Sequence, residues 1–202
     1  DIFRQIDKVL LPKDYLRLRM TGEFASDMSD AAGTMWMNVA KRAWSDAMLQ
    51  ACGLSRDNMP ALYEGCEVTG ALRPEIARAW QMPAVPVVAG GGDNAAGAVG
   101  VGMAEPGQAM LSRGTSGVYF AVSDGFLSRP ESAVHSFCHA LPDRWHLMSV
   151  MLSAASCLDW AARLTGQPDV TALIAAAQRA AGDAPPVWFL PYLSGERTPH
   201  NN

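Results

Sequence analysis

The chain has 202 residues, of which 49% are hydrophobic and 18% are charged, and its formal net charge is −4. A chain of this length and composition can bury a sizeable core, so we expect a globular protein with one large domain or two small ones. Lysine and arginine residues are scattered and form no basic stripe, which argues against nucleic acid or an anionic membrane surface as a partner.

The cysteines predict the cellular compartment of the protein, and the two chain ends predict whether it is a fragment. The cysteines include no C-x-x-C pair, so we expect reduced thiols in a cytoplasmic protein and no disulfide framework. No apolar run is long enough to span a bilayer, and we expect no signal peptide. The chain starts at Asp1 and ends in a polar loop from Glu196 to Asn202, so we expect an internal fragment of a longer protein.

The first part of the chain predicts short elements separated by turns. A buried strand is expected at Val9–Leu11, and a helix is expected from Pro12 to Thr21-Gly22. The small polar residues of Ser26–Thr34 predict a turn or cap, because their side chains bond to nearby backbone. Further predictions are a strand at 36–38, a helix capped by Ser45 and ending at Gly53, and a helix at 74–80.

The pattern then changes twice. The strand Val85–Val88, the turn Gly90-Gly91-Gly92-Asp93 and a helix through Val101 predict a βα unit. After Pro106-Gly107, two strands around the turn 113–116 predict a hairpin. Further strands are expected at 135–141, 145–152 and 187–190, and further helices at 154–164 and 170–181. Alternating helices and strands indicate an α/β fold with two domains, residues 1–103 and 104–202.

The glycine turn before Asp93 is the sharpest candidate for a functional site. Three glycines allow a close approach of a ligand to the backbone, and the helix that follows presents unpaired N–H groups. On local sequence, Asp93 also fits a helix N-cap, and Gly90-x-Gly92-x-x-Ala95 loosely fits a dinucleotide fingerprint. A carboxylate in the turn would repel a pyrophosphate, and no acidic residue follows about twenty positions on. Asp93 therefore fits a proton acceptor better.

Two other segments carry residues of interest. The turn Ser112–Gly117 offers backbone N–H groups and hydroxyls to phosphate oxygens, although an ordinary hairpin turn has the same composition. His135 and His139 are spaced like helical zinc ligands, but this segment predicts a strand, in which four residues span about 13 Å. We therefore expect core or surface histidines and assign no metal ligand.

Several motifs together resemble the FGGY family of carbohydrate kinases, and their order and spacing match along essentially the whole chain. They are Leu10–Leu16, Ser26–Thr34, Gly90–Gly97, Gly114–Gly117, Val150–Ala155 with Trp160, and Phe189–Pro199. The resemblance implies a ribonuclease-H-like, actin/hexokinase-like ATPase fold of two domains that face a cleft, incomplete in this fragment. Residues 1–103 would be the last part of the sugar-binding domain, and 104–202 the first part of the nucleotide-binding domain.

The resemblance also implies an activity and its residues. The family transfers the γ-phosphoryl group of ATP to a sugar hydroxyl with Mg²⁺, and the motifs are most similar to members that act on the C5 hydroxyl of D-xylulose. Carried over by motif, Asp93 is the catalytic base, Asn94 is a sugar contact, and Gly114, Thr115 and Ser116 bind ATP phosphates. The implied partners are the sugar and ATP, with a homodimer as the assembly.

The chain departs from the family pattern in two respects. Arg113 stands where the family has an aliphatic residue, which either adds a cation near phosphate or alters packing. The family's first phosphate loop, D-x-G-T-S, and its adenosine-binding G-G-G-A segment do not occur here, so we expect the chain alone to be inactive. A non-catalytic nucleotide-binding or assembly module on the same fold is the alternative.

Overall fold

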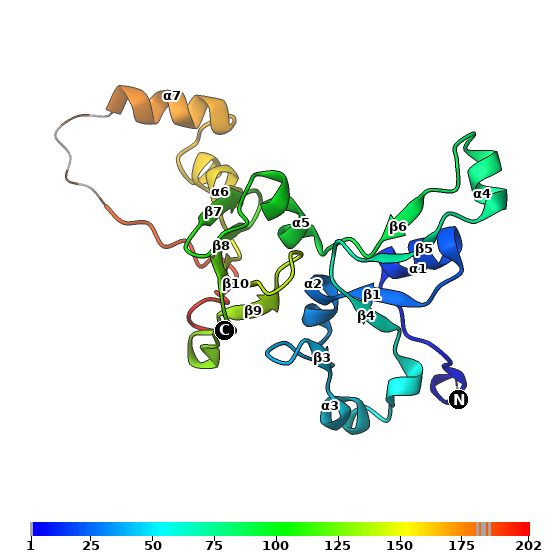
Figure 1. Cartoon of the computed structure of the whole chain (residues 1–202). Helices are drawn as coiled ribbons and strands as arrows, with labels where there is room; N and C mark the ends of the chain where they lie inside the picture. Colours follow the sequence, from blue (N-terminus) through cyan, green and yellow to red (C-terminus); the bar gives the residue numbers. More distant parts are fainter. Residues whose placement is uncertain (1, 181, 183–184, 186) are drawn as a thin grey trace. The chain divides into compact units, whose positions relative to one another are not determined.

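The computed structural model describes residues 2–180, 182, 185 and 187–202. The chain divides into two compact units, whose elements are labelled in Figure 1. The first contains residues up to Gln108 together with Val122–Leu127 and Ser136–His146, and the second contains Ala109–Ala121, Ser128–His135 and the residues from Leu147 onward. The domain boundary expected after residue 103 stays a prediction. No helix among the described residues has the length and apolar character needed to cross a bilayer.

The first unit begins with the 3-10 helix η1 (Phe3–Gln5) and the helix α1 (Pro12–Thr21). The predicted bounds of α1 are confirmed, because Pro12 stands in its first turn and Gly22 ends it in the left-handed conformation, with φ of 87°. The predicted strand at Val9–Leu11 is wrong. The Val9 N–H instead donates to the carbonyl of Asn58, at the end of a 3-10 helix, at 2.8 Å. The segment therefore does not pair with a strand.

Short pairs of strands build the rest of this unit. Helix α1 lies against β1 (Ala25–Asp27) and β5 (Val68–Ala71). Strand β1 pairs in parallel with β4 (Ala61–Tyr63), and β5 pairs antiparallel with β6 (Pro86–Val88). A third pair joins β2 (Met37–Asn38) to β3 (Ala43–Trp44), close to the strand predicted at 36–38.

The prediction of a turn or cap at residues 26–34 is only partly right. Ser26 and Asp27 end β1, and the helix α2 (Met28–Ala31) and the 3-10 helix η2 (Ala32–Thr34) follow. The cap is real, because the Asp27 side chain accepts hydrogen bonds from the N–H groups of Ser29 and Asp30. The small polar residues therefore start a short helix instead of preventing one.

The core of the first unit forms where α2, η2, β2 and β3 meet α3 (Asp46–Ala51) and the residues on either side of the 3-10 helix η3 (Arg56–Asn58). As predicted, Ser45 caps α3, with its side chain accepting from the Met48 N–H. The helix α4 (Pro74–Ala79) also lies within its predicted range. The buried members of the core are Ala31, Ala32, Met37, Trp44, Leu49, Leu54, Met59 and Cys138.

The predicted strand, turn and helix of the βα unit are confirmed as β6, the glycine turn 90–92 and α5 (Asp93–Gly100). The predicted hairpin is confirmed as well: β7 (Ala109–Arg113) pairs antiparallel with β8 (Gly117–Ser123). These strands belong to a sheet of order β7-β8-β10-β9, which includes β9 (His135–Cys138) and β10 (Trp145–Met151). The 3-10 helix η4 (Pro130–Ser132) precedes β9.

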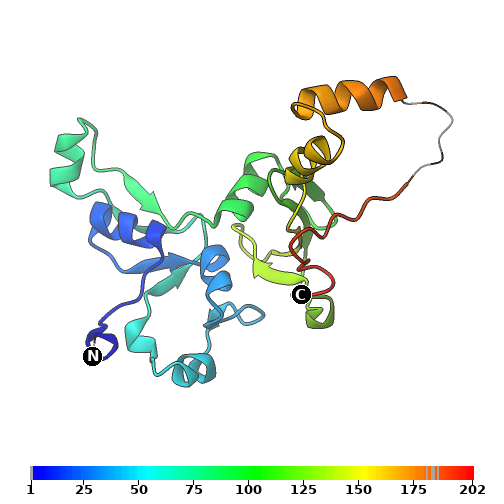
Figure 2. The same cartoon turned by 180° about the vertical axis from the view of Figure 1, so that it is seen from behind.

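In the second unit, helices α6 (Ser156–Leu164) and α7 (Val170–Ala180) lie against each other (Figure 2). The predicted end of α7, Ala181, falls outside the described residues. The strand predicted at Val187–Leu190 is wrong, because this segment has no regular structure and the Trp188 side chain is 91% exposed. Apolar and β-branched composition suggested a strand, but the segment has no pairing partner among the described residues.

Candidate functional site

Asp93 is the first residue of α5, directly after the glycine turn. Gly92 is the N-cap, so the interpretation of Asp93 as the cap is wrong. Asp93 Oδ1 accepts hydrogen bonds from the backbone N–H of Asn94 at 2.7 Å and from Asn94 Nδ2 at 3.1 Å. Asp93 Oδ2 accepts none from the part of the chain that the structure describes, and the side chain is exposed. One carboxylate oxygen is therefore held, and the other is available to a ligand.

The glycine turn is packed closely on both sides. A Cβ atom on Gly91 would lie 3.1 Å from Ala140 Cβ and 3.3 Å from Ser29 Oγ, and one on Gly92 would lie 3.4 Å from Asp30 Cα. Gly90 has a φ of 84°, in the left-handed region that favours glycine. The three glycines therefore allow the backbone to approach α2, which lies beneath the turn.

Charged side chains next to the glycine turn form a network that is buried at Asp14 and Asp27 and half-buried at Lys13 and Asp30. Lys13 Nζ lies 2.6 Å from Asp14 Oδ1, 2.7 Å from Asp27 Oδ1 and 3.8 Å from Asp30 Oδ2. Asp14 and Asp27 are 1% and 0% exposed, so their charges need partners within the protein. Although burial acts to lower the pKa of Lys13, its hydrogen bonds to Asp14 and Asp27 raise that pKa above its usual value. The amino group therefore stays charged at neutral pH.

Arg17 ties this network to the start of the glycine turn. Its guanidinium group donates to Asp14 Oδ1 at 2.8 Å and to the Ala89 carbonyl at 2.7 Å, and it also donates to the Ala25 carbonyl. Ala89 directly precedes Gly90, and Ala25 begins β1. One buried side chain of α1 therefore joins the strand that leads to Asp27 and the segment that leads to Asp93.

Asp30 is a second carboxylate that lies close enough to Asp93 for their charges to interact. Burial raises the pKa of Asp30; the positive charge of Lys13 lowers it, and the negative charges of Asp27, Asp14 and Asp93 raise it further. The sequence did not identify Asp30, Lys13, Asp27 or Ser29 as site residues. These residues lie in the motifs at 10–16 and 26–34 that resemble the kinase family. The sequence alone could not show that both motifs pack next to the glycine turn.

A shallow pocket of about 270 Å³ runs along the glycine turn. Its walls are backbone and small or apolar side chains, and Cys66 is the one thiol among them. The lining residues are Gly65, Cys66, Gly90, Gly91, Ala96, Val99, Ala140 and Leu141.

In the second unit, the predicted phosphate turn is anchored through its carbonyl groups. The Gly114 carbonyl accepts from the Ala155 N–H at 2.9 Å, and the Thr115 carbonyl accepts from the Ala154 N–H at 2.9 Å and from Ser156 Oγ at 3.0 Å. Within the described residues, the N–H groups and hydroxyls of Thr115 and Ser116 make no hydrogen bond, and both side chains are exposed. The Gly114 N–H is engaged, because it donates to the Ser116 carbonyl at 2.9 Å, so the donors that stay available are those of Thr115 and Ser116.

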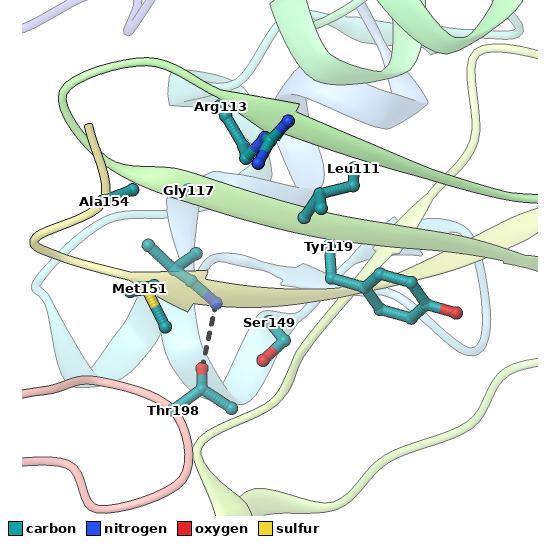
Figure 3. Close-up of a pocket in the computed structure, with 9 residues that line it drawn as sticks. Leu111, Arg113, Gly117, Tyr119, Ser149, Met151, Ala154 and Thr198 are labelled. Atoms are coloured by element: carbon teal, nitrogen blue, oxygen red, sulfur yellow. Dashed lines mark hydrogen bonds between the residues drawn. The ribbon is translucent and has the colours of Figure 1, made fainter. Parts of the chain in front are cut away.

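Beside this turn lies a pocket of about 340 Å³, shown in Figure 3. It is lined by residues of β7, β8 and β10 and by Thr198, whose hydroxyl accepts a hydrogen bond from the Val150 N–H at 3.1 Å. Arg113 is the charged residue among mostly apolar neighbours that include Leu111, Tyr119 and Met151. The position of Arg113 at the end of β7 is compatible with both roles considered for it, packing and attraction of an anion.

Asp93 and Asn94 lie in the first unit, and Gly114, Thr115 and Ser116 lie in the second. Within each unit the predicted residues are neighbours in the chain: Asp93 and Asn94 begin α5, and the other three form the hairpin turn. Their assignment to base, sugar and phosphate roles stays a prediction.

The His139 ring is held by two backbone groups. Leu141 N donates to His139 Nδ1 at 3.1 Å, so the ring proton is on Nε2, which donates to the Met103 carbonyl at 3.1 Å. His139 is fully buried, as expected of a core histidine. Among the described residues, no group of three or more His, Cys, Asp or Glu side chains could hold a metal ion.

Comparisons with known proteins agree with the motifs. Residues 1–100 match the FGGY family of carbohydrate kinases, N-terminal domain. The chain is 84% identical over 202 residues to the xylulose kinase of Escherichia coli (strain K12), covering 100% of this chain and 42% of that protein. It therefore spans less than half the length of this relative.

Solved structures show the fold. The crystal structure described as a "xyloylose kinase" from Brucella ovis is 51% identical, with a TM-score of 0.91, and the match covers 100% of this chain and 42% of that one. The xylulose kinase from Rhodospirillum rubrum is 24% identical, with a TM-score of 0.87 over 98% of this chain and 41% of its own, and shows the fold alone. The predicted α/β fold of the actin/hexokinase-like ATPases is thus confirmed.

Proposed function

This chain belongs to the FGGY family of carbohydrate kinases, and on that premise we propose that the longer protein transfers a phosphoryl group from ATP to the C5 hydroxyl of D-xylulose. The observation that carries the proposal is the state of Asp93. Its carboxylate is exposed at the start of α5, one oxygen is held by Asn94, and the other is available to a sugar hydroxyl.

In the proposed reaction, Asp93 Oδ2 accepts a hydrogen bond from the C5 hydroxyl and takes its proton. The sugar oxygen forms a bond to the γ-phosphorus of ATP, the bond between that phosphorus and the bridging oxygen breaks, and ADP leaves. Phosphoryl transfer depends mainly on positioning and charge stabilisation, so a correctly oriented carboxylate suits this role. The first turn of α5 stabilises the negative charge that Asp93 needs as a base.

The residues beside Asp93 and in the hairpin turn support the same assignment. Asn94 donates to Asp93 through Nδ2, which leaves its Oδ1 as a possible acceptor for a second sugar hydroxyl. The free N–H and hydroxyl donors of Thr115 and Ser116 suit the phosphate oxygens of ATP, and Gly114 directly precedes them in the turn. Kinases of this type use Mg²⁺ with the nucleotide, and we assign no residue and no step to the metal.

The cysteines bear on the compartment in which the protein works. All four cysteines are free thiols, which suits a reducing compartment, so we propose the cytoplasm. A homodimer stays a prediction from the family resemblance.

The experiment uses a chimera in which this chain replaces the matching segment of the Escherichia coli xylulose kinase, a segment 84% identical to it. Asp93→Asn should lower kcat by about 10² or more and leave the KM for D-xylulose nearly unchanged, because general-base catalysis contributes about 10² to 10⁴. Asp46→Asn is the matched control, since Asp46 is also the exposed first residue of a helix in the same unit. Near-normal turnover of Asp93→Asn would refute the proposal.

A further inference from the structure

We propose that Ser29 is a positioning residue for Asp93, and that the ion pair between the half-buried Lys13 and the buried Asp27 orients the Ser29 hydroxyl for this purpose. The inference rests on the proposed function, because Ser29 has this role only if Asp93 is the base. A continuous set of contacts from Lys13 through Asp27 and Ser29 to the backbone of Gly92 carries it.

The Ser29 hydroxyl is the donor in one hydrogen bond and the acceptor in another. It donates its single proton to Asp27 Oδ2 and accepts a hydrogen bond from the Gly92 N–H at 2.9 Å. An ionised carboxylate can only accept, so the Ser29 proton must point to Asp27, and a lone pair is left for Gly92. Ser29 is 5% exposed and Asp27 is 0% exposed, so bulk water has little access to either contact.

Asp27 is itself fixed in place. Its Oδ2 accepts from the N–H groups of Ser29 at 2.9 Å and Asp30 at 3.0 Å, as the cap of α2. Its Oδ1 lies 2.7 Å from Lys13 Nζ. A rotation of the Asp27 carboxylate would break the cap and the ion pair together, so the acceptor that orients Ser29 has little freedom to move.

The Ser29 hydroxyl contacts Gly92, the residue directly before Asp93. Gly92 is the N-cap of α5 and directly precedes Asp93, so a shift of the Gly92 backbone moves the Asp93 carboxylate. On its other side the turn is held by Gly65, whose carbonyl accepts from the Gly90 N–H at 2.9 Å. The Ser29 hydroxyl fixes the end of the turn nearest to Asp93. Because a misplacement of about 1 Å can lower a rate by about 10², a contact of this kind affects kcat more than binding.

The test compares Ser29→Ala, Ser29→Thr and Ser29→Cys in the chimera. Ser29→Ala should lower kcat about tenfold, change the KM for D-xylulose less than about twofold, and speed hydrogen exchange at the Gly92 amide at least about tenfold. Ser29→Thr keeps the hydroxyl and should recover most of kcat and of the amide protection. Ser29→Cys has a similar size with weak hydrogen bonding, and should resemble Ala.

Ser26→Ala is the matched control. Ser26 is a serine three residues away, 1% exposed, whose hydroxyl has no hydrogen-bond partner among the described residues. It should leave kcat and the exchange of the Gly92 amide unchanged. An equal loss of kcat in Ser26→Ala and Ser29→Ala would show a general effect of packing and overturn the inference.

Other outcomes separate this inference from the proposed function. Unchanged kcat or unchanged Gly92 exchange in folded Ser29→Ala would overturn the positioning role, even where Asp93→Asn is inactive. Full activity of Asp93→Asn would refute the proposed function, while faster Gly92 exchange in Ser29→Ala would still confirm the contact. If both Ala and Cys variants fail to fold while Ser26→Ala folds, Ser29 is a folding requirement and the positioning role is wrong.

Discussion

The hydroxyl of Thr115 lies exposed in a turn whose carbonyl groups are already engaged, so its loss should not disturb the hairpin. Thr115→Val in the chimera should raise the KM for ATP at least about tenfold, because a hydrogen bond to a charged group contributes about 1.5 to 3 kcal/mol. The KM for D-xylulose should hardly change. Steady-state kinetics with each substrate varied would measure both constants.

Thr165→Val is the control for this change. Thr165 is an exposed threonine of the same unit, and its hydroxyl donates to the Ala161 carbonyl at 2.8 Å at the end of α6. It should leave both KM values unaltered. An equal rise of both constants in Thr115→Val would indicate that the turn is purely structural.

The buried His146 makes stability depend on pH. Burial, followed by the charge of His139, lowers the pKa of His146 to about 3, and its ring stacks on Phe137 with the centroids 5.4 Å apart. The unfolded chain binds a proton on this residue near its usual pKa of about 6.5, whereas the folded chain does so only near pH 3. The folded state should therefore lose stability as the pH falls from about 6.5 towards 3.

His146→Phe keeps a stacking ring and removes the titrating group. Chemical unfolding of the 202-residue chain at pH 7.5 and pH 5 should show a smaller loss of unfolding free energy in the variant than in the parent. His139, whose burial also lowers its pKa, remains and accounts for part of the loss in both proteins. An equal loss in the two proteins would show that His146 does not contribute.

At the residue scale, the sequence predicted the position of Asp93 but not its surroundings. The β-branched run before three glycines and the helix after them predicted that Asp93 stands at the start of a helix. The Ser29 contact joins residues 63 positions apart in the chain, and no local pattern reports such a pairing. The ion pair of Lys13 and Asp27 was missed for the same reason.

At the scale of elements, predictions succeeded where the local signal was a cap or a turn. Pro12 and Gly22 delimit α1, Ser45 caps α3, and the turn at 113–116 joins β7 to β8. They failed where apolar composition was the only signal, at Val9–Leu11 and Val187–Leu190. A strand needs a pairing partner, and composition does not reveal whether one is present.

Two glycines of the first unit should respond to alanine in opposite ways. Gly97 lies inside α5, and a Cβ there would meet nothing within 4 Å, so Gly97→Ala should stabilise the fold by about 0.5 to 1 kcal/mol. A Cβ on Gly65 would lie 2.3 Å from the Ala140 carbonyl oxygen and 2.7 Å from that of Gly90. Because backbone must move to make room, Gly65→Ala should destabilise the fold by about 1 to 3 kcal/mol.

Chemical unfolding of the two variants beside the parent chain would measure both changes. Gly65→Ala should also speed hydrogen exchange at the Gly90 amide, which donates to the Gly65 carbonyl. A stable Gly65→Ala protein with an undisturbed glycine turn would contradict the packing described for this turn.

At the scale of the whole molecule, the chain carries one part of each predicted binding site. Asp93 and the donors of Thr115 and Ser116 are present, whereas the family's D-x-G-T-S and G-G-G-A segments do not occur in this sequence. The Escherichia coli relative is more than twice as long, with 42% of its length matched. Positioned side chains accelerate phosphoryl transfer only when both substrates are held against them in one site.

We therefore expect that the 202-residue chain alone neither binds ATP tightly nor phosphorylates D-xylulose. The physical reason is that effective molarity is lost when part of the contacts to nucleotide and metal is missing, however well Asp93 is placed. Exposed apolar side chains such as Trp188, at 91% exposure, should also favour self-association of the isolated chain. Calorimetry with ATP and Mg²⁺, a coupled assay for ADP release with D-xylulose, and light scattering would test these expectations, with the chimera as the active control. Micromolar ATP affinity, or ADP release that depends on the sugar, would show that this chain holds a complete site by itself.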